Sequence, residues 1–134
     1  MDRKVGNLTA REVMGLSLLV GLLLAGLLSG WYMGRQHRQI SRELEDSAWL
    51  ALSGQWENAR KKAEGAKEEW ERSRKIRAAL SDHTPMEEID DLFGELIVFG
   101  AAGEQTEFAR ACMSLSGRVT AMGNAHTLSW WNVL

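Results

Sequence analysis

The stretch VMGLSLLVGLLLAGLLSGWYM, Val13–Met33, decides how this 134-residue chain is organised, because it holds no Asp, Glu, Lys or Arg. A helix of this length extends roughly 30 Å, which matches the hydrocarbon core of a bilayer. Trp31 and Tyr32 stand at its C-terminal edge, where aromatic rings favour the headgroup level. The stretch therefore predicts an uncleaved, single-pass signal anchor.

Two other interpretations compete with the anchor. A cleaved signal peptide has an apolar region of only about 7–15 residues that ends in small residues spaced A-x-A. Leu28 disrupts that spacing before Gly30. A buried helix of a soluble domain rarely keeps an unbroken apolar run of this length. The length of the run favours the membrane anchor over both.

The basic residues around the span do not decide its orientation. Arg3, Lys4 and Arg11 precede the span, and Arg35, Arg38 and Arg42 follow it. The positive-inside rule is therefore tied. The short basic tail, 1–12, and the usual behaviour of signal anchors favour a cytoplasmic N-terminus in the cell membrane. The helical domain, 34–134, would then be extracytoplasmic. A scaffold that faces the cytoplasm is the alternative.

Composition narrows the class of the domain. Cys112 is the single cysteine, so neither an internal disulfide nor a cysteine metal cluster can form. The formal net charge of −2 argues against a nucleic-acid partner. One proline and few β-branched runs indicate an all-α domain.

Apolar periodicity predicts a small antiparallel bundle of about four helices in two hairpins, 38–81 and 84–123, with a tail, 124–134. Ser53 and Gly54 separate the first two helices, and Gly100, Gly103 and Gly123 are predicted to end the later ones. In the second helix, Trp56, Ala59, Ala63, Ala66 and Trp70 form a heptad-like seam. The predicted structural core comprises Trp56, Trp70, Phe93, Leu96, Phe108 and Leu115.

A helix start is predicted at Thr84. Thr84 is a good N-cap, Pro85 suits the first helical position, and Glu87 completes a capping box. The two hairpins also share a pattern, since SGQ precedes Trp56 and GEQ precedes Phe108. Tetratricopeptide-type repeats stack hairpins by a similar logic. A plain antiparallel bundle fits the pattern equally well.

The chain resembles a clostridial and Firmicutes family of small single-pass membrane proteins catalogued as a domain of unknown function. The residues that carry the resemblance are Trp56, Ala59, Trp70, His83, Thr84, Asn132, Val133 and Leu134. It covers nearly the whole chain and implies an anchored helical domain with no assigned activity. The Trp130–Trp131 pair departs from the family pattern.

The sequence contains no recognisable catalytic constellation, cofactor motif or metal site. None of His37, His83 and His126 has a second ligand at metal spacing, and no nucleophile motif accompanies Asp82–His83. Between Asp82 and Glu107 the charges are all acidic. A divalent-cation sensor, or an enzyme that uses this acidic helix and His83, is therefore the alternative to a non-enzymatic interaction module. Charge complementarity with the preceding basic helix is the simpler explanation.

Small residues suggest how the span packs. Gly26, Gly30 and Gly34 recur at i,i+4, and Ser17, Gly21 and Ala25 form a second row. Such rows let membrane helices approach closely, although glycine is also common in spans generally. The expected partners are the bilayer and a second membrane helix, from another copy or from a membrane protein. No small-molecule substrate is evident.

Gly30→Ile should weaken association of the span with another helix, because a branched side chain separates the two backbones. Leu23→Ile is the matched control and should hardly change association. Crosslinking in membranes measures both variants. Equal crosslinking of Gly30→Ile and the parent would show that the glycines reflect only the composition of the span.

Overall fold

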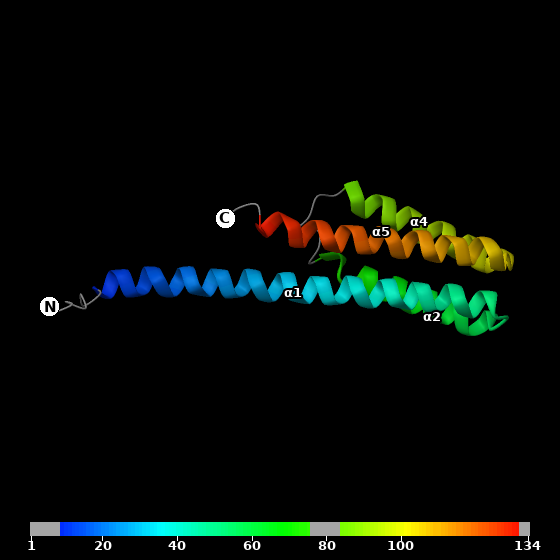
Figure 1. The fold of residues 1–134 in the computed structure, drawn as a ribbon, viewed down its shortest axis with the longest axis horizontal. Helices are drawn as coiled ribbons and strands as arrows, with labels where there is room; N and C mark the ends of the chain where they lie inside the picture. Colours follow the sequence, from blue (N-terminus) through cyan, green and yellow to red (C-terminus); the bar gives the residue numbers. More distant parts are fainter. Residues whose placement is uncertain (1–8, 76–83, 132–134) are drawn as a thin grey trace. The chain divides into compact units, whose positions relative to one another are not determined.

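The computed structural model describes the backbone of residues 9–75 and 84–131, and side chains in 9–75 and 86–125. The helices that lie wholly within these ranges are α1 (Ala10–Leu52), α2 (Trp56–Arg72), α4 (Thr84–Ala102) and α5 (Gln105–Trp131) (Figure 1). The chain divides into two compact units, Met1–Tyr32 and Met33–Leu134, and the boundary falls inside α1. We call the second unit the bundle. The prediction of an all-helical protein with a long apolar N-terminal helix is confirmed for the described residues.

A capping box that the sequence analysis missed begins α1. The Thr9 backbone N–H donates to Glu12 Oε2 at 2.7 Å, and the Glu12 N–H donates to Thr9 Oγ1 at 3.4 Å. The hydrogen bond from the Thr9 backbone lowers the pKa of Glu12 below its ordinary value. The spacing T-x-x-E in Thr9–Glu12 is the sequence signal for this start.

Two glycines make the described turns. Gly54, between α1 and α2, has φ of +82°, and Gly103, between α4 and α5, has φ of +74°. This left-handed backbone is costly for residues with a Cβ atom. Hydrogen bonds close both turns: Gln55 N–H donates to Leu50 O at 2.9 Å, and Glu104 N–H donates to Phe99 O at 3.1 Å. The predicted breaks at Gly54 and Gly103 therefore coincide with helix ends.

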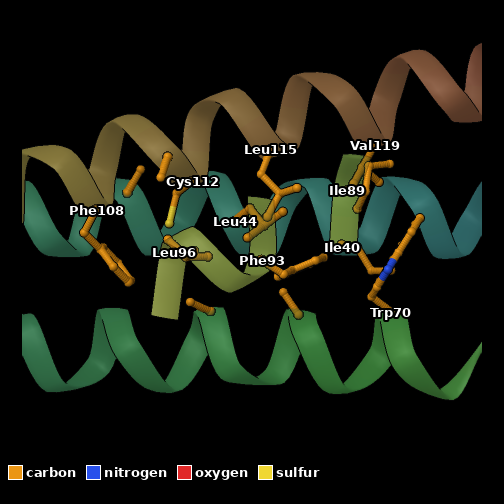
Figure 2. Packing of buried hydrophobic residues seen from close by; sticks show 14 of the residues in the cluster. Ile40, Leu44, Trp70, Ile89, Phe93, Leu96, Phe108, Cys112, Leu115 and Val119 are labelled. Carbon is orange, nitrogen blue, oxygen red and sulfur yellow. The ribbon is translucent and has the colours of Figure 1, made fainter. Parts of the chain in front are cut away.

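The core of the bundle combines a helix of small residues with helices of large ones. In α2 the buried seam is Ala59, Ala63, Ala66 and Trp70. Large apolar side chains of α1, α4 and α5 fill the space beside it; those labelled in Figure 2 include Ile40, Leu44, Ile89, Phe93, Leu96, Phe108, Leu115 and Val119. Trp56 is only partly buried, and its ring meets Phe108 edge-on with 4.9 Å between centroids. The small side chains of α2 allow it to lie close to its neighbours.

Trp70 joins three helices. Its side chain is 1% exposed, and its ring centroid lies 6.2 Å from those of both His37 on α1 and Phe93 on α4. The indole Nε1–H donates to Asp90 Oδ1 on α4 at 2.7 Å. This hydrogen bond offsets the cost of burying the indole N–H, so Trp70 contributes apolar contact without an unsatisfied donor.

The structure differs from the sequence prediction at Gly100 and Gly123. α4 continues through Gly100 to Ala102, and α5 continues through Gly123 to Trp131, so 124–131 is not a separate tail. The packing is close at Gly123, whereas an added Cβ atom at Gly100 would make an ordinary contact. A Cβ atom would lie 3.4 Å from the Phe108 ring at Gly100 and 3.2 Å from His37 Cβ at Gly123. Glycine within a helix costs only about 1 kcal/mol relative to alanine, which close packing can offset.

Trp70→Ala should lower the free energy of unfolding by about 3–5 kcal/mol, because it removes a buried aromatic side chain and leaves a cavity. Trp49 provides the matched control, since its side chain is 67% exposed. Trp49→Ala should change stability by less than about 0.5 kcal/mol. Denaturant unfolding of the full chain in mild detergent, followed by circular dichroism, measures both. Similar losses for the two variants would contradict the role of Trp70 in the core.

Candidate functional site

The first candidate surface is the apolar part of α1 before the bundle. Most of its leucines, among them Leu16, Leu19, Leu22, Leu23, Leu27 and Leu28, are more than half exposed. An 18-residue window in α1 has a mean hydropathy of 2.2, and none of it is buried. α1 is long and apolar enough to cross a membrane, and a signal sequence near an N-terminus has the same length and composition. Exposing such an apolar surface to water is unfavourable, so transfer of this segment to an apolar environment would stabilise it.

The predicted small-residue rows lie on this exposed segment and its continuation. A Cβ atom built at Gly21 or Gly30 meets no described atom within 4 Å, whereas one at Gly34 lies 3.5 Å from Arg38 Nη1. Ser17 Oγ donates to Val13 O at 2.6 Å, so the hydroxyl is satisfied within its own helix. The rows are thus unoccupied at Gly21 and Gly30, and association through them stays a prediction.

The second candidate is the acidic surface of α4, where ion pairs engage two of the carboxylates. Asp90 accepts the indole N–H of Trp70, and its other oxygen lies 3.4 Å from Arg74 Nη2. Glu88 pairs with Arg118 of α5. Within the described ranges no group of three or more His, Cys, Asp or Glu side chains could hold a metal ion. Asp82 and His83, which the cation hypothesis invokes, lie outside the described residues.

The third candidate is a shallow hollow where α2 faces α4 and α5. Its apolar lining includes Phe93, Leu96, Ile97, Gly100 and Phe108, and Arg60, Glu64 and Lys67 of α2 are also among the lining residues. The cavity volume is about 80 Å³. Small-molecule sites usually enclose roughly 300–1,000 Å³. The hollow is therefore on the scale of a single side chain of a partner and not of a substrate.

A layer of polar contacts joins α1 to α5 inside the bundle. Ser41 Oγ lies 2.9 Å from Thr120 Oγ1 and donates to Ser116 O at 3.2 Å. Ser116 Oγ in turn donates to Glu45 Oε1 at 2.8 Å. Because buried hydroxyls need partners, this layer specifies the pairing of the two helices. The sequence analysis missed it, since serines on an apolar stripe carry no pairing signal of their own.

Cys112 belongs to the same α1–α5 contact. Its thiol donates to Ser47 Oγ at 3.5 Å, and Ser47 Oγ donates to Ala59 O of α2 at 2.7 Å. Burial raises the pKa of the Cys112 thiol to about 11. The thiolate is the reactive form of cysteine, so the raised pKa disfavours reaction of this side chain near neutral pH.

The core and cap residues predicted from the sequence differ in burial and in how much of them the structure describes. Trp70, Phe93, Leu96, Phe108 and Leu115 are buried, and Trp56 packs against the core from its edge. α4 begins at Thr84, and Glu87 lies in its first turn, whereas the predicted cap by the Thr84 side chain stays a prediction. The side chains of Thr84 and Pro85, and the whole of Asn132–Leu134, lie outside the described residues.

No protein-family model, curated protein or solved structure matches this chain. The resemblance to the clostridial and Firmicutes family therefore stays a prediction, and function has to be argued from the chain itself.

Cys112 should resist maleimide in the native protein near neutral pH, because its thiol is buried and its pKa is raised to about 11. Unfolding in denaturant should restore labelling. A Ser53→Cys variant supplies an exposed thiol for comparison and should take up one label per native chain. Two labels per native chain of that variant, counted by mass spectrometry, would contradict the burial of Cys112.

Proposed function

We propose that this chain is a membrane-anchored helical module without enzymatic activity that binds other proteins at the membrane surface. The observation that carries the proposal is the contrast within one chain. The segment from Val13 to Tyr32 exposes its leucines and is apolar, whereas the bundle from Met33 onward buries its own core. A bilayer would cover the exposed leucines of the apolar segment, and the bundle would not need to unfold or rearrange.

The anchor in this proposal crosses the membrane once, with the N-terminus in the cytoplasm and the bundle outside it. Within the membrane, the row of Gly26, Gly30 and Gly34 is the contact for a second helix. The partner is another copy of the chain or a membrane protein. In the bundle, we interpret the helices as two stacked hairpins of the loosely tetratricopeptide-like kind.

The bundle itself supports binding of a protein over catalysis. The hollow of about 80 Å³ beside α2 suits one apolar side chain, with Arg60 and Lys67 available for carboxylates around it. These cations form exposed pairs with Glu57 at 3.6 Å and with Glu71 at 3.3 Å. Such exposed pairs are worth only about 0–1 kcal/mol, so a partner can replace them.

A cation-responsive function gains no comparable support. Of the carboxylates on α4, Asp90 and Glu88 already pair with Arg74 and Arg118. A cation would have to displace these guanidinium groups before it could bind there. The protein-binding proposal requires no such rearrangement.

Leu23→Arg should release the chain from membranes. Leu23 is the middle residue of Val13–Met33, and an arginine at the centre of a span costs about 2.5–3.5 kcal/mol on insertion scales. Leu23→Ile, the matched control, should remain in the membrane fraction after alkaline carbonate extraction. If the parent chain is itself extracted by carbonate, the anchor and the proposed function are both wrong.

A further inference from the structure

The hollow beside α2 combines an apolar lining with charged side chains. Phe93, Leu96 and Phe108 of the core contribute to the lining (Figure 2). Ile97, which also lines the hollow, is 47% exposed, so part of the apolar surface faces water. A side chain that covers this surface would have to be apolar itself.

The charged part of the lining comes from α2 and comprises Arg60, Glu64 and Lys67, which we call the rim. The three residues recur at i, i+4 and i+7, so they lie on one flank of the helix. Two cations and one carboxylate therefore stand beside the apolar lining. A complementary partner would present an apolar side chain with two carboxylates and one cation around it.

The bundle carries such a group near the end of α1. Trp49 is 67% exposed, and the exposed Glu45 and Asp46 precede it by four and three residues, on the same face of the helix. Lys62 of α2 completes the group, since its Nζ lies 3.0 Å from Asp46 Oδ2. We call these four residues the Trp49 patch. Its charges are the reverse of those on the rim.

The rim and the Trp49 patch lie on opposite flanks of α2. At 3.6 residues per turn, Arg60, Glu64 and Lys67 point roughly 140–160° away from Lys62 around the helix axis. One copy of the bundle can therefore use both surfaces at the same time. A contact between the patch of one copy and the hollow of the next would be heterologous, so it could continue from copy to copy.

The two surfaces also lie at neighbouring levels along the bundle. Asp46 of α1 pairs with Lys62 of α2, and Ser47 Oγ donates to Ala59 O. Ala59 directly precedes Arg60 of the rim. Two bundles that stand side by side and point the same way can therefore bring the patch of one against the hollow of the other.

We propose that Trp49 of one copy of the chain inserts into the hollow of a second copy. This inference rests on the proposed protein-binding role of the hollow and names its occupant. The edge of the indole ring fills the hollow of about 80 Å³, and the rest of the ring covers Ile97. The carboxylates of the Trp49 patch face the cations of the rim, and Lys62 faces the rim carboxylate. Tryptophan is enriched among the residues that dominate binding at protein interfaces.

The test crosslinks single-cysteine chains that mark the two surfaces. Ser53→Cys lies beside Trp49, and Ala101→Cys lines the hollow. Each change is made in the full chain with Cys112→Ser and with Gly30→Ile, which removes the predicted contact through the span. The two chains carry different tags and are reconstituted together in phosphatidylcholine liposomes with a short bifunctional maleimide. The mixed 53–101 product should exceed the 53–53 and 101–101 products by more than random pairing gives.

Two kinds of variant test the residues themselves. Trp49→Ala in the Ser53→Cys chain should lower the mixed product about tenfold or more, as expected for truncating a central tryptophan of an interface. Met113→Ala removes an exposed apolar side chain of α5 outside both surfaces and should change nothing. Arg60→Glu in the chain that marks the hollow should lower the yield, and Asp46→Lys in the other chain should restore it.

Random proportions of the three products, an unchanged yield with Trp49→Ala, or no recovery with Asp46→Lys would each overturn the inference. Chains that give no mixed product but stay in the membrane after alkaline carbonate would leave the hollow to a different protein, with the proposed function intact. Extraction of the parent chain by carbonate would overturn the proposed function together with this inference.

Discussion

The burial of Trp70 is the contact on which the bundle depends. The alanine seam of α2 offers little apolar volume, so one large side chain must fill the space where α1, α2 and α4 meet. An indole in that position carries an N–H that cannot remain unpaired, and Asp90 of α4 accepts it. Asp90 is held in turn by Arg74. Packing and hydrogen bonding therefore require the same arrangement of α2 and α4, and His37 and Phe93 pack around it.

A different kind of contact pairs α1 with α5. Hydroxyls of Ser41, Ser47 and Ser116 lie at positions where a simple core would carry leucine, and each has a hydrogen-bond partner across a helix contact. Apolar contacts between two helical faces tolerate sliding, whereas buried hydroxyls lose their partners when the register shifts. The same interface brings His37 against Gly123, where an added Cβ atom would lie 3.2 Å from His37 Cβ. The register of α5 determines where its final turn lies.

The two units differ in the surfaces that they expose. The bundle from Met33 onward buries a core of large apolar side chains, whereas the preceding part of α1 leaves its leucines exposed.

The sequence by itself determined the features that depend on local chemistry. The apolar run of Val13–Met33, the turns at Gly54 and Gly103, the start of α4 at Thr84 and the large core residues all follow from periodicity, caps and glycine conformation. Gly100 and Gly123 have the same local signal as Gly103, yet they lie inside helices, where an added Cβ atom would lie 3.4 Å from the Phe108 ring and 3.2 Å from His37 Cβ, respectively. Contacts that span the chain were likewise decided only by tertiary structure. Ser41 with Thr120, Trp70 with Asp90, and the hollow beside α2 each depend on which helices become neighbours. The type of a side chain predicts whether it is buried. Which residue it contacts depends on how helices that are distant in sequence pack together.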